Sequence, residues 1–320
     1  MKMNMKNKLI ALCIPAMLLS GCGNAQTASQ PAGSSAETAP AETSAPEPTE
    51  KSLVTLGDSI SFGYGTDDPD TERYSALVTK ALSEQDGITW TDYNYAVVGD
   101  DSSDLLKKLN NGRAMRLPSA DAVVLYIGAN NLLGVYGQYL ESKSDALGID
   151  VSDPTHMDSA AAEEIREKLE SQLDDEEQVF KELNALIDGN LERLETDLED
   201  IYTFIRDRNA DADVYVLNIY EPYTTEADSG IVKDNAAFYG FSAEQIARAN
   251  QVIADFTAKH DDLVPVDIHA AYAEYDAPPV IGNGGDTPQG GDFSFYDPHP
   301  TAEGQRCIAE TLLKAMEPQK

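Results

Sequence analysis

A serine near the start of the chain and a histidine near its end are the two side chains best set for nucleophilic chemistry. Ser59 stands in "LGDSISFG" (56–63), and His299 stands between two prolines in "DPHPTAEGQ" (297–305). A serine hydroxyl is a poor nucleophile near neutral pH unless a nearby base takes its proton, and histidine is the commonest such base. Together the two side chains would support attack on an acyl carbon.

Two further residues are candidate donors to the oxyanion that such an attack creates. Gly99 lies in "VVGDDSSDL" (97–105), where the absence of a side chain would let its backbone N–H approach a substrate closely. Asn130 lies in "YIGANNLLG" (126–134), and its amide donates without losing a proton. The Ser59 backbone N–H is a third donor. Each has an ordinary alternative: a helix cap for Ser59 and turn positions for Gly99 and Asn130.

The group that would orient His299 is left open between two alternatives. Both Asp297 and His299 precede a proline, which favours extended backbone. In an extended segment, residues two apart point the same way, so Asp297 can reach the imidazole. Alternatively, a backbone carbonyl orients the imidazole, and Asp297 caps a helix that starts near Thr301.

The other three histidines are weaker candidates for the base. His269 also follows an aspartate by two residues, but no proline or helix start accompanies it. His156 lies in an acidic segment, and His260 ends a predicted helix. We interpret each of them as a surface or structural residue.

The elements that must position these side chains can be predicted from apolar patterning. Short apolar runs predict strands at 52–57, 92–99, 122–128, 213–220 and 263–268. Helical spacing and capping residues predict helices at 73–84, 100–112, 176–209, 242–260 and 301–316. Strands that alternate with helices indicate a parallel α/β sheet covered on both faces, and such sheets bind ligands at the carboxyl ends of their strands. Ser59, Gly99 and Asn130 each follow one of the first three strands.

The order Ser, Gly, Asn, His resembles the SGNH hydrolases, also called GDSL esterases and lipases. The matching blocks, which span most of residues 52–316, are "GDSI" (57–60), "NYAVVGDDSSDLL" (94–106), "GANN" (128–131), "NADADVYVLNIYEPY" (209–223) and "DPHPTAEGQ". The resemblance implies a flavodoxin-like α/β/α sandwich with a five-stranded parallel sheet and a helical insertion after the third strand. It also implies that Ser59 is the nucleophile and His299 the base. The Ser59 and Gly99 N–H groups and the Asn130 side chain would form the oxyanion hole.

Two positions depart from the family pattern. Asn131 stands where the family usually has aspartate after its asparagine. The family's usual Asp-x-x-His would need an aspartate at Tyr296, whereas here the spacing is Asp297-x-His299. The second departure puts the partner of the histidine in question.

The N-terminal fifty residues are predicted to be an export signal followed by a lipid-anchored linker. Residues 1–21 have a lysine-rich start and a short apolar run, "LIALCIPAMLL", which is typical of an export signal. The following Cys22 ends "LSGC", which resembles a lipoprotein attachment site; the alternative is an ordinary cleaved signal. Residues 22–51 read as a lipid-anchored linker, because from 23 to 50 they contain no Ile, Leu, Val or aromatic residue. Residues 52–320 would form the hydrolase domain.

The net charge of the chain limits the classes of molecule that it is expected to bind. Its formal net charge is −33, which disfavours binding to nucleic acid or anionic headgroups, although a lipid would still hold the chain on a membrane. We see no phosphate loop and no His/Cys/Asp cluster with metal-ligand spacing, and we expect neither a cofactor nor a metal. Cys307 is expected to be a small buried hydrophobe. The oligomeric state is left open.

These features predict an extracytoplasmic, membrane-tethered serine hydrolase that cleaves small neutral carboxylic esters. Two alternatives are a polysaccharide O-deacetylase with the same site and an inactive ligand-binding lipoprotein. Residues 132–175 are expected to be an insertion beside the site. Its Tyr136, Tyr139 and Leu140 would either line an acyl-binding surface or simply pack on the sheet.

Overall fold

The computed structural model describes residues 50–147, 176–223, 236–283 and 296–317. The predicted signal, Cys22, almost all of the linker, His156 and the larger part of the 132–175 insertion lie outside these ranges. Within them, none of the helices combines the length and apolar character needed to cross a bilayer.

Five parallel strands form the central sheet. They are β1 (Lys51–Gly57), β2 (Trp90–Asn94), β3 (Ala122–Tyr126), β4 (Asp213–Leu217) and β5 (Leu263–Val266). Their order is β2-β1-β3-β4-β5, and each neighbouring pair is parallel. This is the flavodoxin-like strand order, so the predicted fold class is confirmed.

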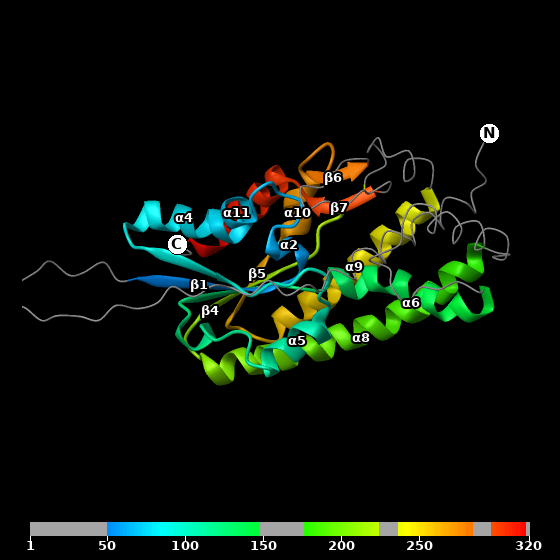
Figure 1. The fold of residues 1–320 in the computed structure, drawn as a ribbon, viewed down its shortest axis with the longest axis horizontal. Helices are drawn as coiled ribbons and strands as arrows, with labels where there is room; N and C mark the ends of the chain where they lie inside the picture. Colours follow the sequence, from blue (N-terminus) through cyan, green and yellow to red (C-terminus); the bar gives the residue numbers. More distant parts are fainter. Residues whose placement is uncertain (1–49, 148–175, 224–235, 284–295, 318–320) are drawn as a thin grey trace, which may run out of the picture.

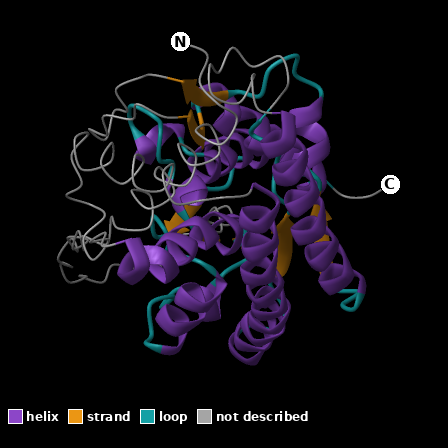
Figure 2. Cartoon of the chain, turned by 90° about the vertical axis from the view of Figure 1, so that its right-hand side faces the viewer, coloured by secondary structure: helices purple, strands orange, loops and turns teal. Residues whose placement is uncertain are grey.

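Helices cover both faces of the sheet (Figure 1). On one face lie α4 (Tyr74–Asp86), α10 (Ile268–Ala273) and α11 (Ala302–Met316). On the other lie α5 (Ser102–Asn110), α6 (Ala129–Leu147), α8 (Glu176–Arg208) and α9 (Ala236–Ala258). Figure 2, turned by 90°, shows the helices packed around the strands.

Side chains point alternately to the two faces of the sheet along each strand, which divides the hydrophobic core into two clusters. On β1, Val54 and Leu56 pack with α5 and α8, whereas Leu53 packs with α4 and α11 on the opposite face. Successive strand residues point to opposite faces, so a sheet buried on both sides reads as a continuous apolar run. Cys307 lies buried in the second cluster, as its apolar setting predicted.

The structure corrects the ends of the predicted strands. The second strand was predicted at 92–99 but ends at Asn94, whose side-chain Oδ1 accepts from the Ala96 N–H and turns the chain. The fifth was predicted to reach residue 268, but Asp267 caps α10 and Ile268 begins that helix. Apolar residues therefore continue past the point where the sheet ends.

Several short elements were not predicted from the sequence. They are α2 (Ser59–Phe62), α3 (Pro69–Glu72), a 3-10 turn η1 (Leu117–Ser119), α10, and the antiparallel pair β6 (Val280–Asn283) and β7 (Tyr296–Pro300). The described part of the predicted insertion is a continuation of α6, which starts before it at Ala129. Helix α9 starts before the predicted residue 242.

Candidate active site

Ser59 is placed by a tight turn at the carboxyl end of β1. Gly57 is required there, because a Cβ would lie 2.3 Å from the Ser61 Oγ and 2.5 Å from the Tyr126 carbonyl oxygen. Asp58 then caps α2, its side chain accepting from the Ile60 N–H at 2.9 Å. Ser59 is thus the first residue of a helix, where its own N–H has no helical acceptor.

His299 reaches Ser59 from β7. The imidazole Nε2 lies 2.8 Å from Ser59 Oγ, and Nδ1 lies 2.7 Å from Asp297 Oδ1. Asp297 Oδ1 also accepts from the His299 backbone N–H at 2.9 Å. A carboxylate only accepts, so Nδ1 carries the proton and Nε2 faces the serine hydroxyl as an acceptor.

The surroundings of Asp297 bear on the two alternatives for the group that orients His299. Extended backbone in β7 puts Asp297 and His299 on the same side, and both side chains are buried. Helix α11 is capped instead by Thr301, whose Oγ1 accepts from the Gly304 N–H. The structure therefore places the carboxylate, rather than a backbone carbonyl, at Nδ1.

Two neighbouring tyrosines support this histidine. The Tyr220 hydroxyl donates to the Pro298 carbonyl oxygen at 2.7 Å, which holds β7 between Asp297 and His299. The Tyr64 ring packs on the imidazole, with ring centroids 4.5 Å apart. Neither tyrosine was among the predicted site residues, because both contacts join segments far apart in the sequence.

The two predicted oxyanion donors lie on adjoining segments. Asn130 is in the first turn of α6, and its Nδ2 donates to the Asp100 carbonyl oxygen at 2.9 Å. That bond uses one of the two amide hydrogens and ties Asn130 to the loop that holds Gly99. Gly99 has a φ of +84°, a conformation in which glycine is strongly favoured. Asn130 lines the same pocket as Ser59 and His299.

Asn131, the departure from the family pattern, has a packing role in this chain. Its Nδ2 donates to Ser102 Oγ at 2.8 Å, and its Oδ1 accepts from the Ser102 N–H at 3.1 Å. Ser102 Oγ in turn donates to Asp197 on α8. An amide can both donate and accept here, so it joins the starts of α5 and α6.

The remaining described histidines lie in other settings. His260 Nε2 contacts Glu199 at 2.8 Å, and its ring packs on Tyr202. His269, in α10, has its Nδ1 3.2 Å from the Ile219 carbonyl oxygen. Neither lines the pocket that holds Ser59.

Three carboxyl groups in the segments that follow β1, β2 and β4 have raised pKa values. Burial raises the pKa of Asp58 to about 7, although the Ile60 N–H and the nearby His299 act in the opposite direction. Burial also raises the pKa of Asp100, against the lowering effect of its ion pair with Lys108. Glu221, after β4, has its pKa raised to about 7 by burial.

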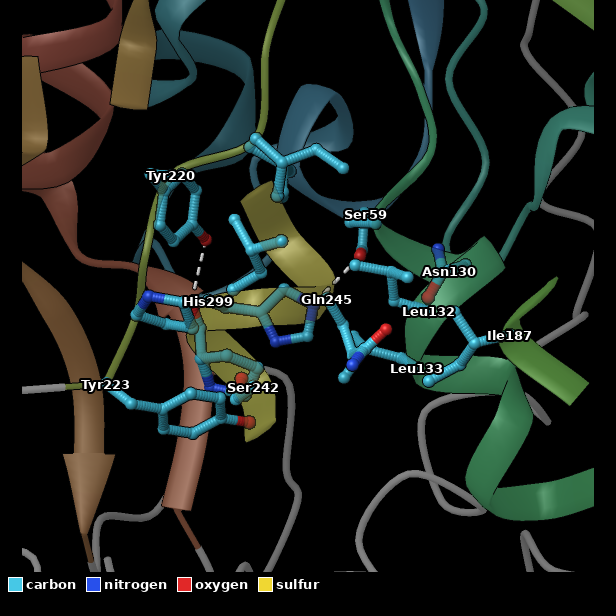
Figure 3. A pocket seen from close by; sticks show the side chains of 16 residues that line it. Ser59, Asn130, Leu132, Leu133, Ile187, Tyr220, Tyr223, Ser242, Gln245 and His299 are labelled. Carbon is cyan, nitrogen blue, oxygen red and sulfur yellow. Dashed lines mark hydrogen bonds between the residues drawn. The ribbon is translucent and has the colours of Figure 1, made fainter. Parts of the chain in front are cut away.

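A pocket opens from Ser59 between α6, α8 and α9 (Figure 3). Its empty volume, including space open to solvent, is about 710 Å³. The apolar part of its wall includes Leu132, Leu133, Ile187, Ile219 and Ile246.

Tyr136, Tyr139 and Leu140 were expected either to line an acyl-binding surface or to pack on the sheet. Tyr139 is buried in the core, in agreement with the second alternative, while the side chains of Tyr136 and Leu140 lie outside the described part. Leu132 and Leu133, at the start of the predicted insertion, line the pocket. Polar side chains of Ser242 and Gln245 also line it and were not predicted. Within the described ranges, no cluster of three or more His, Cys, Asp or Glu residues could hold a metal ion.

Comparison with known proteins gives a family match over most of the body. Residues 55–307 match the sequence model of the GDSL-like Lipase/Acylhydrolase family. No curated protein sequence matches the chain.

Solved structures share the fold at low identity. The extracellular lipase from Streptomyces rimosus has a TM-score of 0.56 and 18% identity, covering 83% of this chain and 100% of its own. Phospholipase A1 from Streptomyces albidoflavus NA297 has a TM-score of 0.56 and 20% identity, and the match covers 83% of this chain and 99% of the phospholipase chain. The lipase Lip_vut3 from a goat rumen metagenome has a TM-score of 0.52 and 18% identity, and the match covers 83% of this chain and 97% of the lipase chain.

Proposed function

The chain belongs to the GDSL-like lipase/acylhydrolase family, and on that premise we propose that it is a serine hydrolase that cleaves carboxylic esters at Ser59. The observation that carries the proposal is the line of contacts from Asp297 Oδ1 to His299 Nδ1, at 2.7 Å, and from His299 Nε2 to Ser59 Oγ, at 2.8 Å. These distances are those of a base ready to take the serine proton.

In the first half of the reaction, Ser59 Oγ attacks the ester carbonyl carbon while His299 Nε2 takes its proton. The carbonyl oxygen becomes an oxyanion, for which the Ser59 and Gly99 N–H groups and the second Asn130 amide hydrogen are the proposed donors. His299 then gives its proton to the leaving alcohol as the carbon–oxygen bond breaks, leaving an acyl-serine.

In the second half, a water molecule gives a proton to His299 Nε2 and attacks the acyl-serine. Return of that proton to Ser59 Oγ releases the acid. Asp297 acts through His299, because its carboxylate accepts from Nδ1–H and stabilises the imidazolium formed in each half. Its burial strengthens this interaction, since little water screens it.

The pocket supports a neutral ester with a hydrocarbon arm as the substrate. Leu132, Leu133 and Ile187 offer apolar carbon to such an arm, and burying each of its methylenes contributes roughly 0.8 kcal/mol. The formal net charge of −33 disfavours anionic substrates. The same apolar wall makes an acetylated polysaccharide a weaker alternative.

We further propose that the enzyme works outside the cytoplasm, tethered to a membrane through lipid on Cys22. The support is the sequence alone: the apolar run that ends in "LSGC" and the polar linker that follows.

A fluorophosphonate probe tests the serine hydrolase directly. Wild-type protein should label at Ser59 and hydrolyse p-nitrophenyl acetate, whereas Ser59→Ala should do neither and keep its circular dichroism spectrum. Turnover by the purified variant above a small fraction of wild type would exclude Ser59 as the nucleophile. A folded wild-type protein that neither labels nor hydrolyses would instead support the ligand-binding alternative.

A further inference from the structure

Two polar side chains interrupt the apolar wall of the pocket. Ser242 and Gln245 lie one turn apart on α9 and line the pocket opposite Leu132 and Leu133 of α6 (Figure 3). Both are buried, with 8% and 3% of their surface exposed. A polar group buried in an apolar wall is costly unless it is hydrogen-bonded, so such a group needs an explanation.

The Gln245 amide is held in one orientation by its neighbours. Its Oε1 accepts from Arg248 Nη1 at 2.7 Å, and Arg248 is itself paired with Asp188. A guanidinium only donates, so the amide atom facing it must be the oxygen. The other end of the amide is therefore the nitrogen, Nε2.

That nitrogen has no acceptor in the described part of the chain. Gln245 Nε2 is fully buried there without a hydrogen-bond partner. Leaving a buried donor unpaired costs about 1–3 kcal/mol, which an acceptor on a bound ligand would offset. The neighbouring Ser242 hydroxyl can donate or accept, so it complements a ligand hydroxyl beside Gln245.

We propose that Gln245 determines substrate specificity by donating a hydrogen bond from Nε2 to an oxygen atom in one arm of the ester. The preferred substrate is then an ester whose carbon chain carries an ether or hydroxyl oxygen, rather than a plain alkyl ester. This inference rests on the proposed function, since it assigns the substrate class of the same site.

The test measures kcat/KM for esters in which one methylene is replaced by an ether oxygen. One series varies the acyl arm, from p-nitrophenyl hexanoate through its ether isosteres. The other varies the alcohol arm, from hexyl acetate through its ether isosteres. Dividing each ether-to-alkyl ratio of a variant by that of wild type cancels the intrinsic reactivity of the esters.

Gln245→Met keeps the length of the side chain and removes the donor. For at least one oxygen position, its ether-to-alkyl ratio should fall about five- to tenfold below that of wild type, the size of one neutral hydrogen bond. Gln245→Glu, which keeps a partner for Arg248 but also lacks the amide donor, should lose the same preference. It serves if the methionine variant does not fold.

The matched control is Gln251→Met, which changes an exposed glutamine on the same helix. Its ratios should equal those of wild type. If plain esters are hydrolysed but both Gln245 variants keep the wild-type ratio at every position in both arms, the assignment of Gln245 is wrong while the proposed function stands. If folded wild type hydrolyses neither series, the proposed function fails and the inference fails with it.

Discussion

Asp58 carries a carboxyl group that the fold buries directly beside the proposed nucleophile. Its Oδ1 accepts from the Ile60 N–H, whereas its Oδ2 is buried without a partner in the described part of the chain. Burial disfavours the ionised form and raises the pKa from 3.8 to about 7. Between these two values the folded chain holds a proton that the unfolded chain has lost, so this group lowers stability as pH rises through that window.

Asp58→Asn should therefore stabilise the protein more at pH 8 than at pH 4. An asparagine cannot ionise, and its Oδ1 can still cap α2. The gain over wild type should differ between the two pH values by on the order of 4 kcal/mol, given about 1.36 kcal/mol per pKa unit. Urea unfolding at both pH values measures it, with Asp276→Asn as the exposed control. An equal gain at both pH values would contradict the raised pKa.

Asp297→Asn tests whether the carboxylate works through His299. An asparagine in its place weakens the hold on the Nδ1–H tautomer and on the imidazolium, so kcat should fall by about 10⁴-fold, as in the serine protease triad. KM should change little, because the lost interaction belongs to the transition state. His299→Ala should be nearly inactive in either case and so serves as the reference. A kcat of Asp297→Asn within about tenfold of wild type would reduce the proposed triad to a dyad.

At the scale of elements, the packing of the first turn of α11 determines the position of His299. Gly304 lies in the first turn of α11, and an added Cβ would be 2.4 Å from the Pro279 carbonyl oxygen and 2.6 Å from the Tyr272 hydroxyl. Pro279 also accepts from the Thr301 N–H, just after β7. Helix α11, the approach to β6 and the end of β7 are therefore packed as one unit.

Gly304→Ala should displace that unit and lower both stability and activity. Overpacking of this kind typically costs about 1–3 kcal/mol, and the displaced β7 would move His299 from Ser59. Gly189→Ala is the matched control, since nothing lies within 4 Å of its added Cβ in α8. It should instead stabilise by roughly 0.5–1 kcal/mol. Thermal unfolding and kcat of both variants test this prediction. A Gly304→Ala enzyme with the stability and kcat of wild type would mean that α11 and β7 adjust independently.

The elements that the sequence predicted are those whose pattern is local. The five strands and helices α4, α5, α8, α9 and α11 follow from apolar periodicity, and the positions of Ser59, Gly99 and Asn130 follow from where the first three strands end. Helix α2, with four residues, is too short to give a periodic signal. Ser242 and Gln245 were not predicted because only the tertiary packing of α9 against α6 and α8 turns them into a pocket wall.

At the scale of the whole molecule, the topology joins the two ends of the domain. Ser59 follows the first strand and His299 stands on the last, yet both reach one pocket at the carboxyl end of the sheet. Strand β1 lies between β2 and β3, so the loops that carry Ser59, Gly99 and Asn130 leave adjacent strands. The chain goes from β1 to β2 on one side and then to β3 on the other, and ligands bind such sheets at the point where the strand order reverses.

The tether is the remaining prediction, and it concerns where the molecule works. If Cys22 carries lipid, residues 23–50 would link the membrane to β1 with a reach on the order of 90 Å at about 3.3 Å per residue. Cys22→Ala should move the protein from the membrane fraction to the soluble fraction without lowering kcat on p-nitrophenyl acetate, because the described residues that line the site lie between Ser59 and His299, after the linker. Cys307→Ala, which changes a buried cysteine, should leave the protein in the membrane fraction. Persistence of Cys22→Ala on the membrane would mean that another contact holds the protein there. Since the formal net charge is −33, binding to anionic headgroups is not expected to replace the lipid.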